Sequence, residues 1–266
     1  MSFSPILPAT GTVGWSFLKR TAAVQQAALA RSPEIRREAD YFREKIGKID
    51  TADQLVADRR LLRVALEAFG LEADVDSRAF IRKVLTDGTL KTGALATRLA
   101  DPRYKALTEA FGFGDFSVPN TKLSDFADKT LKQWQERRFE TAVGGQNGDF
   151  RLALNAGREL AAVARGNVSE TTKWLRIIGN PPLRTVMQKA LNLPDSFAAI
   201  DIDRQVAMLR EKAATAFGSQ TVSQFADPAR TEDVVRRFLL NSDVRLQPQS
   251  TALTLLSQTR SLMRRI

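Results

Sequence analysis

Apolar residues recur at three- and four-residue steps along most of this 266-residue chain, and residues that cap helices stand at the ends of the segments they mark. This spacing places apolar side chains on one face of an α-helix. The clearest case covers 33–46, where Ser32 comes first as an N-cap and Gly47 follows as a stop. The chain is therefore expected to be helical along most of its length.

The same signals predict a series of further helices. Thr51 and Gln54 fit a capping box, and Gly70 is the matching stop. Asp101 and Pro102 begin another helix. This helix is expected to end at Gly112, and a short helix is expected before Gly88. The remaining helices are expected over 123–141, 150–164, 169–178, 181–192, 201–217 and 230–241. No alternating strand or hairpin pattern occurs among them, so the expected fold class is all-α and multi-helical.

Weak internal repetition accompanies this pattern. The stretches 66–71, 108–113 and 188–193 each end a helix with Gly or Asn, which tolerate the left-handed C-cap, and then continue with an apolar residue. The stretches 123–128 and 222–227 also resemble each other. Two interpretations stay open: duplicated helical-hairpin units stacked side by side, or the shared chemistry of unrelated helix ends.

The net charge of +10 lies mostly at the two ends of the chain. No acidic residue precedes Glu34, and 244–266 holds four arginines and no acid. The sequence predicts a flexible N-terminal arm over 1–15, a helical body over 16–245, and a C-terminal amphipathic helix over 246–266. If the body contains two subdomains, they are expected to meet near 115–123 or 143–149.

The chain contains neither cysteine nor histidine. This excludes disulfides, thiol nucleophiles and histidine-based triads, and it removes the usual ligands of zinc, copper and haem. Carboxylate chemistry remains, but the glycine cluster at 144–148 lacks the lysine of a phosphate-binding loop. The acidic clusters lack the ligand spacing of an EF-hand and are interpreted as helix caps or solvated residues: Asp74, Asp76, Asp195, Asp201 and Asp203. We expect no enzymatic activity, no cofactor and no metal site.

The C-terminal segment is the main candidate for a contact surface. After Pro248, Ser250 fits an N-cap, and the apolar residues that follow cover about a third of a helix circumference: Ala252, Leu255, Leu256, Thr259, Leu262, Met263 and Ile266. Such a face docks on the chain's own core, or it binds a partner or a second copy. The residues expected to bind a partner are Leu255, Leu256, Leu262, Met263, Ile266 and Trp15.

The three tryptophans lie among helical apolar residues. Trp134 and Trp174 are expected in the core. Trp15 lies where the arm meets the first helix, so it either anchors the arm or contacts a partner.

Three arginine pairs raise the alternative of a nucleic-acid-binding or regulatory protein: Arg59-Arg60, Arg137-Arg138 and Arg236-Arg237. Acidic residues stand close to them in the sequence, which is typical of ion-paired helix surfaces and not of a phosphate-binding face. Nucleic acid is therefore not the expected partner. No apolar run approaches the roughly 20 residues of a membrane span. The N-terminal sequence also lacks the pattern of a secretory signal, so Sec-type export is not expected.

Several stretches between residues 35 and 245 carry a likeness to a known family: Ala79-Phe-Ile-Arg-Lys-Val-Leu85, Arg98-Leu-Ala-Asp-Pro-Arg-Tyr104, Ala110-Phe-Gly-Phe113, Lys132-Gln-Trp134, Pro181-Pro-Leu-Arg184, Asp201-Ile-Asp-Arg-Gln-Val206 and Arg236-Arg-Phe-Leu239. The chain resembles a bacterial family of unknown function whose members are typically encoded among flagellar genes in alphaproteobacteria. The family supplies no catalytic residues.

The resemblance implies a role in the assembly or structure of the flagellum, with flagellar proteins as partners and self-association as an open alternative. The protein would lie in the cytoplasm, or at the flagellum after export without a signal peptide. We therefore predict a non-enzymatic protein that works through protein–protein contacts.

Overall fold

The computed structural model describes residues 3–99 and 101–246. Within these ranges the chain forms thirteen α-helices, four short 3-10 helices and no strand, which confirms the all-α prediction. The α-helices are α1 (Gly11–Ala30), α2 (Pro33–Ile46), α3 (Ala52–Ala57), α4 (Arg59–Phe69), α5 (Arg78–Asp87), α6 (Leu95–Arg98), α7 (Pro102–Phe111), α8 (Phe126–Gly144), α9 (Gly148–Arg165), α10 (Glu170–Ile178), α11 (Pro181–Ala190), α12 (Ile202–Phe217) and α13 (Pro228–Leu246). The 3-10 helices are Glu72–Asp74, Asn120–Lys122, Asp195–Ala199 and Val222–Ala226.

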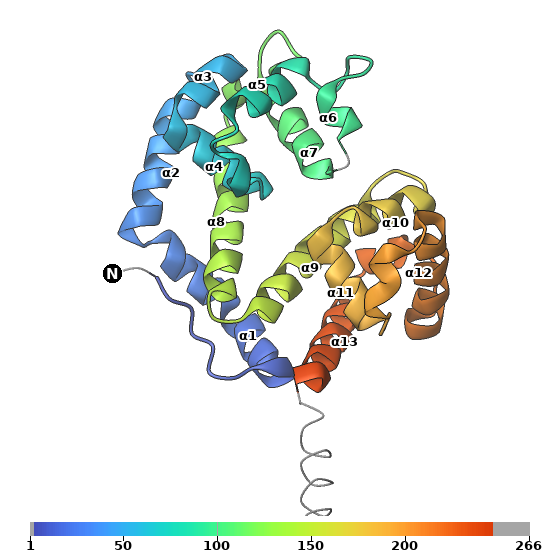
Figure 1. Cartoon of the computed structure of the whole chain (residues 1–266). Helices are drawn as coiled ribbons and strands as arrows, with labels where there is room; N and C mark the ends of the chain where they lie inside the picture. Colours follow the sequence, from blue (N-terminus) through green and yellow to red (C-terminus); the bar gives the residue numbers. More distant parts are fainter. Residues whose placement is uncertain (1–2, 100, 247–266) are drawn as a thin grey trace, which may run out of the picture.

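Two groups of helices lie on either side of the turn between α8 and α9 (Figure 1). In the first group α2 and α4 pack against α8, and in the second α11 and α13 pack against α9. Helix α1 contacts both α8 and α13 and so joins the groups, and one apolar core runs through both. The α8–α9 turn falls within 143–149, whereas 115–123 lies inside the first group, between α7 and α8.

The three similar helix ends share the expected left-handed conformation. Gly70 ends α4 with a φ of 73°, and Gly112 ends α7 with a φ of 68°. Asn192, just after α11, has a φ of 51°. By contrast, the second pair of similar stretches differs in structure, since Phe126 begins α8 while Phe225 lies in a 3-10 helix. Helix-end chemistry thus explains the first likeness, and duplication of a hairpin unit stays a prediction.

The helix expected between Thr51 and Gly70 is two helices. Thr51 accepts a hydrogen bond from the backbone N–H of Gln54, as the capping box predicts, but α3 ends at Ala57. The Asp58 carboxylate then caps α4 by accepting from the N–H groups of Arg60 and Leu61. Apolar periodicity continues across this break, so spacing alone did not show it.

The N-terminal arm differs from the expected flexible segment over 1–15. Helix α1 begins at Gly11, and the preceding residues pack along the body. The backbone N–H of Ile6 donates to Gln25 Oε1 at 2.8 Å, and Gln146 Nε2 donates to the carbonyl of Pro5 at 2.7 Å. A Cβ at Gly14 would lie 1.9 Å from the carbonyl oxygen of Ala9, so a glycine is required where the arm approaches α1.

The C-terminal amphipathic helix predicted over 246–266 lies outside the described residues, except for Leu246 at the end of α13. The predicted partner-binding residues Leu255, Leu256, Leu262, Met263 and Ile266 lie outside them as well.

Candidate functional site

Trp15 is buried and holds three helices together. Its indole N–H donates to Glu232 of α13 at 3.0 Å, and its ring centroid lies 6.1 Å from that of Phe150 in α9. Of the two roles considered for Trp15, the structure shows an anchor for the start of α1. Burial of the ring supports the anchor role, and contact of Trp15 with a partner stays a prediction. Trp134 and Trp174 are also buried, as predicted.

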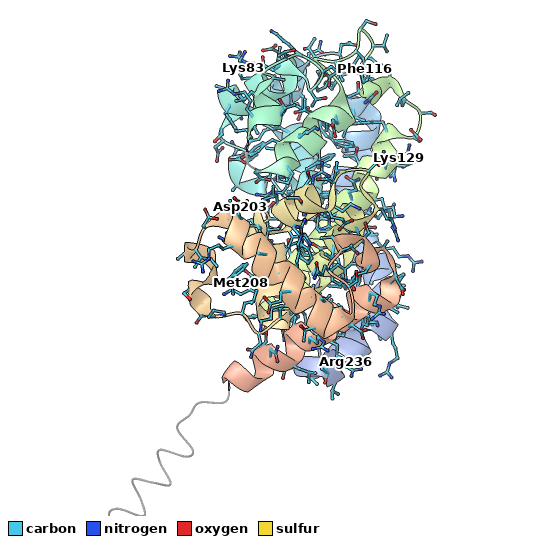
Figure 2. The ribbon with its side chains drawn as sticks, turned by 90° about the vertical axis from the view of Figure 1, so that its right-hand side faces the viewer. Lys83, Phe116, Lys129, Asp203, Met208 and Arg236 are labelled. Carbon is cyan, nitrogen blue, oxygen red and sulfur yellow. The ribbon has the colours of Figure 1, made fainter. Side chains whose placement is uncertain are left out.

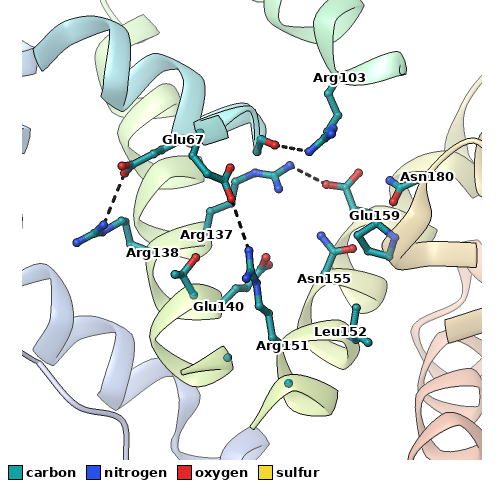
Figure 3. A pocket seen from close by; sticks show the side chains of 16 residues that line it. Glu67, Arg103, Arg137, Arg138, Glu140, Arg151, Leu152, Asn155, Glu159 and Asn180 are labelled. Carbon is teal, nitrogen blue, oxygen red and sulfur yellow. Dashed lines mark hydrogen bonds and ion pairs between the residues drawn. The ribbon is translucent and has the colours of Figure 1, made fainter. Parts of the chain in front are cut away.

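A cleft of about 520 Å³ lies between the two helix groups, beside the α8–α9 turn (Figure 3). No local sequence pattern predicts this cleft, because its walls come from segments far apart in the chain. Its charged side chains are Glu67, Glu72, Arg103, Arg137, Arg138, Glu140, Arg151 and Glu159. Four of them are basic and four are acidic, so the lining is balanced in charge.

Two half-buried arginines, Arg137 in the lining of the cleft and Arg158 beside it, join α8 to α9. Arg137 Nε donates to the carbonyl of Ala68 at 2.9 Å, and its Nη2 donates to Glu159 at 2.9 Å. Arg158 holds the Glu140 carboxylate with two hydrogen bonds of 3.0 Å and also reaches Glu159. Burial lowers the pKa of Arg137, and Arg158 lowers it further. Burial also lowers the pKa of Arg158, but the carboxylates of Glu140 and Glu159 raise it above its usual value.

The other arginines of the cleft are also engaged. Arg103 holds the Asp101 carboxylate in a bidentate pair and donates to the carbonyl of Gly70. Arg151 lies 3.5 Å from Glu72, and Arg138 pairs with Glu34 and Glu67. Figure 3 shows the contact of Arg138 with Glu67 and that of Arg137 with Glu159. The network joins α4, α7, α8 and α9, so the role that its geometry supports is to hold the two helix groups together.

Acidic side chains of the described ranges serve as caps and ion-pair partners. Asp201 caps α12 by accepting from two backbone N–H groups, Asp74 accepts from the Tyr104 hydroxyl, and Asp76 pairs with Arg59. Among residues 3–99 and 101–246, no group of three Asp or Glu side chains is placed to hold a metal ion.

Three arginine dipeptides suggested the alternative of nucleic-acid binding, and the structure gives several of these arginines a partner within the chain. Arg60 contacts Glu38 at 3.3 Å, and Arg138 contacts Glu34 at 3.2 Å. The Arg237 guanidinium lies over the ring of Phe217. These contacts fit ion-paired helix surfaces, since the acids reduce the charge available to a phosphate backbone. In the described part of the chain, none of the helices is long and apolar enough to cross a bilayer.

Four large apolar side chains are exposed on two neighbouring loops, which we call the loop surface. Leu90 is 73% exposed and lies between α5 and α6, while Phe116 (52%), Val118 (64%) and Leu123 (57%) lie between α7 and α8. Figure 2 shows Phe116 at one end of the molecule and Arg236 of α13 toward the other. Contiguous exposed apolar surface marks interaction sites, whereas single exposed residues are ordinary.

Asp115 fixes the two loops against each other. Its carboxylate accepts from the backbone N–H groups of Thr89 and Leu90 at 2.6 and 2.9 Å, and from the Thr89 hydroxyl at 2.9 Å. Burial raises the pKa of Asp115, but these hydrogen bonds lower it more, so that it lies below its usual value. Gly88 and Gly114 allow the approach, because a Cβ at Gly114 would lie 2.4 Å from the Gly88 nitrogen.

The rest of the α7–α8 connection is also hydrogen-bonded to the body. Asn120 Nδ2 donates to the carbonyls of Glu109 and Ala110 at the end of α7. The Thr121 hydroxyl donates to the carbonyl of Ile49 at 2.7 Å, and Lys122 contacts Asp50. The exposed apolar side chains are thus presented on a fixed support.

Comparison with known proteins gives a family and a fold relative but no activity. The crystal structure of protein AGR_C_984 from Agrobacterium tumefaciens is similar, with a TM-score of 0.74 and 25% sequence identity over 92% of this chain and 100% of that one. No curated protein matches the chain. Residues 68–231 match the family described as "Protein of unknown function (DUF1217)". Because this match covers more than half of the sequence, the chain belongs to that family.

Proposed function

We propose that this chain is a non-enzymatic assembly protein that binds a protein partner through the loop surface. The observation that supports the proposal is the exposure of four large apolar side chains on loops that Asp115 and Asn120 hold in place. Apolar side chains that a fold holds in water are what a protein interface needs at its centre.

The energetics favour a protein partner. Full burial of a Val, Leu or Phe side chain contributes about 1.5–3 kcal/mol. Four side chains that are more than half exposed therefore offer several kcal/mol to an interface. Because the loops are already ordered, little conformational entropy is lost on binding.

The flagellar setting is part of the proposal and comes from the family resemblance. It rests on the basic, cysteine-free composition and on the expectation of a flagellar gene context that the resemblance implies. Within this proposal the partner is a flagellar component, and the protein acts in the cytoplasm or at the flagellum. The predicted contacts at Leu255 to Ile266 lie outside the described residues, so the loop surface is the support that the described chain offers.

Site-specific photo-cross-linking in living cells tests the partner contact. A photoreactive phenylalanine derivative replaces Phe116, and the control places it at exposed Asp203 of α12. We expect a discrete adduct with one protein from position 116 and none from position 203. Mass spectrometry of the adduct identifies the partner, for which a flagellar protein is expected. The absence of an adduct at 116, or the same adducts from both positions, would contradict the proposal.

A further inference from the structure

Asn155 of α9 lines the cleft with a carboxamide that the described chain leaves unpaired. Its Oδ1 atom is buried and accepts no hydrogen bond within the described residues. Because no such bond fixes the carboxamide, a rotation about Cβ–Cγ turns either the oxygen or the N–H groups toward the cleft. Buried polar atoms are nearly always hydrogen-bonded, so an unpaired one in the wall of a cleft indicates a site that a ligand can complete.

Three polar side chains of α9 line the cleft in a row: Arg151, Asn155 and Glu159. Their spacing of four residues places them on one side of the helix, about 6 Å apart along its axis. Figure 3 labels all three where they extend from α9 toward the cleft. The row therefore has a cation at one end, a carboxamide in the middle and a carboxylate at the other end.

Arg151 makes the N-terminal end of this row positive. It lies in the first turn of α9, where the helix dipole adds to its charge. It lies 3.5 Å from Glu72, and both side chains are about half exposed. Exposed ion pairs of this kind are weak, so the carboxylate of a ligand can take the place of Glu72.

Glu159 gives the other end of the row a free acceptor. Arg137 and Arg158 both donate to its Oε1 atom, whereas Oε2 accepts no hydrogen bond from the described chain. Unlike the Asn155 oxygen, Oε2 is not buried. An ammonium group of a ligand can therefore donate to Glu159 without displacing either arginine.

The row matches a short peptide in length and chemistry. Arg151 and Glu159 are eight residues apart, so their Cα atoms lie about 12 Å apart along the helix. An extended tripeptide spans about 10–11 Å. The asparagine carboxamide fits a peptide unit, because its oxygen accepts from an N–H group and its nitrogen donates to a carbonyl. The cleft volume of about 520 Å³ is that of an ordinary small-ligand pocket.

The rest of the lining favours a peptide over a phosphate-bearing ligand. Its charged side chains are balanced, so the cleft has no net attraction for an anion. Leu152 and Pro182 add apolar surface for the side chains of a ligand. Gly148 leaves room near Arg151, since none of the described atoms lies within 4 Å of a Cβ built on it.

We propose that the cleft binds a short extended peptide with free ends, which lies along α9 and runs antiparallel to it. The C-terminal carboxylate of the peptide pairs with Arg151, a central peptide unit bonds the Asn155 carboxamide, and the amino terminus donates to Glu159. The cleft shares no residue with the loop surface, so this site goes beyond the proposed function and does not depend on it.

Binding of trialanine to the full chain, followed by saturation-transfer NMR, tests the proposal. The contacts involve only the backbone and the two ends of the ligand, so a peptide without distinctive side chains is a sufficient probe. We expect saturable binding below about 10 mM, in the range that a few hydrogen bonds provide. N-acetyl-trialanine amide, which lacks both charged ends, should bind at least tenfold more weakly. Free alanine and inorganic phosphate should not compete.

Two variants test the named contacts. Arg151→Gln should weaken the binding of trialanine at least tenfold but leave that of trialanine amide unchanged, because the amide has no carboxylate. Asn155→Ala should weaken the binding of both peptides about fivefold. It removes no hydrogen bond of the described chain, so the fold is expected to stay intact, which circular dichroism checks. The matched control is Arg165→Gln at the exposed far end of α9, which should bind like the parent.

Three results would overturn the proposal: no saturable binding of trialanine, equal binding of the free and blocked peptides, or unchanged binding in both cleft variants. Competition by free alanine or phosphate as strong as that by trialanine would overturn it too, since the cleft would then recognise a single charged group. None of these outcomes alters the result expected from cross-linking at Phe116.

Discussion

The indole N–H of Trp15 donates to the Glu232 carboxylate at 3.0 Å and joins residues 217 positions apart in the sequence. Lys19 contacts the same carboxylate oxygen at 2.9 Å. Through Glu232 the first helix of the chain is fixed to the last described helix, and through Phe150 it reaches α9. Trp15 is thus a packing residue that closes the fold.

Removal of the Trp15 side chain is expected to destabilise the protein strongly. Trp15→Ala should lower the free energy of unfolding by about 3–5 kcal/mol, because it leaves a cavity beside Phe150. The matched control is Val13→Ala, two residues earlier in the same helix, where the side chain is 73% exposed. That change should alter the free energy of unfolding by no more than about 0.5 kcal/mol. Urea denaturation measures both, and equal losses would contradict the anchor role.

The pair of buried Glu140 and half-buried Arg158 is expected to show coupling. Glu140→Ala leaves the Arg158 guanidinium without its bidentate partner but with its contact to Glu159, so the free energy of unfolding should fall by about 1.5–3 kcal/mol. The double variant Glu140→Ala/Arg158→Ala should lose less than the sum of the single losses, by about 0.5–3 kcal/mol. Thermal and urea unfolding of the parent, the two single variants and the double variant provide this double-mutant cycle.

An exposed pair of the same chain, Arg43 with Asp128, is the control for that cycle. Its removal should cause no measurable loss, since solvent screens the interaction. A cycle for Glu140 and Arg158 that is additive within error would show that the cleft network does not join α8 to α9.

Gly70 and Gly218 share a left-handed conformation but differ in surroundings. Both have φ above 70°, so alanine at either costs roughly 1–2 kcal/mol for conformation alone. A Cβ at Gly70 would also lie 2.6 Å from Arg137 Nη1, whereas none of the described atoms lies within 4 Å of a Cβ at Gly218. Gly70→Ala should therefore destabilise the protein more than Gly218→Ala in urea unfolding. Equal losses of stability in the two variants would contradict the position of the Arg137 guanidinium beside Gly70.

Acid is expected to weaken the support of the loop surface. The pKa of Asp115 is lower in the folded protein than its ordinary value of 3.8. Its contribution is therefore fully present above that value and is lost as the pH falls through the folded pKa. Asp115→Asn should cost about 1–2 kcal/mol at pH 7. The difference from the parent should shrink as the pH falls below 3.8.

Unfolding followed from pH 7 to pH 2.5 checks that sign. Asp40→Asn, on the exposed side of α2, is the control and should leave stability at pH 7 within error. A stability difference between Asp115→Asn and the parent that grows toward low pH would contradict the role of the ionised Asp115 carboxylate in holding the two loops together.

Local signals determined what the sequence could predict. Ser32, Thr51, Asp101 and Asn180 precede helices, and Gly70, Gly112 and Asn192 follow them, because caps act on neighbouring backbone groups within one turn. The break at Asp58 was missed, since its carboxylate caps a new helix without interrupting the apolar spacing.

Long-range contacts determined what the sequence could not predict. The cleft depends on Arg103, Arg137 and Glu159 from three different helices, and no spacing rule joins them. The loop surface depends on Asp115, which joins two loops 25 residues apart. Proline and glycine near the N-terminus suggested a free arm, but Gln25 and Gln146 hold it by side-chain hydrogen bonds that composition does not reveal.

The amount of this protein that co-purifies with flagellar hook–basal bodies, from motile cells of the bacterium that encodes it, tests the central claim most directly. The compared variants are Phe116→Asp/Val118→Asp on the loop surface and Ile202→Asp, an exposed apolar control on α12. We expect the parent and the control in the flagellar fraction and the double variant in the supernatant. A parent protein that stays in the supernatant, or a double variant that co-purifies as well as the parent, would contradict the account.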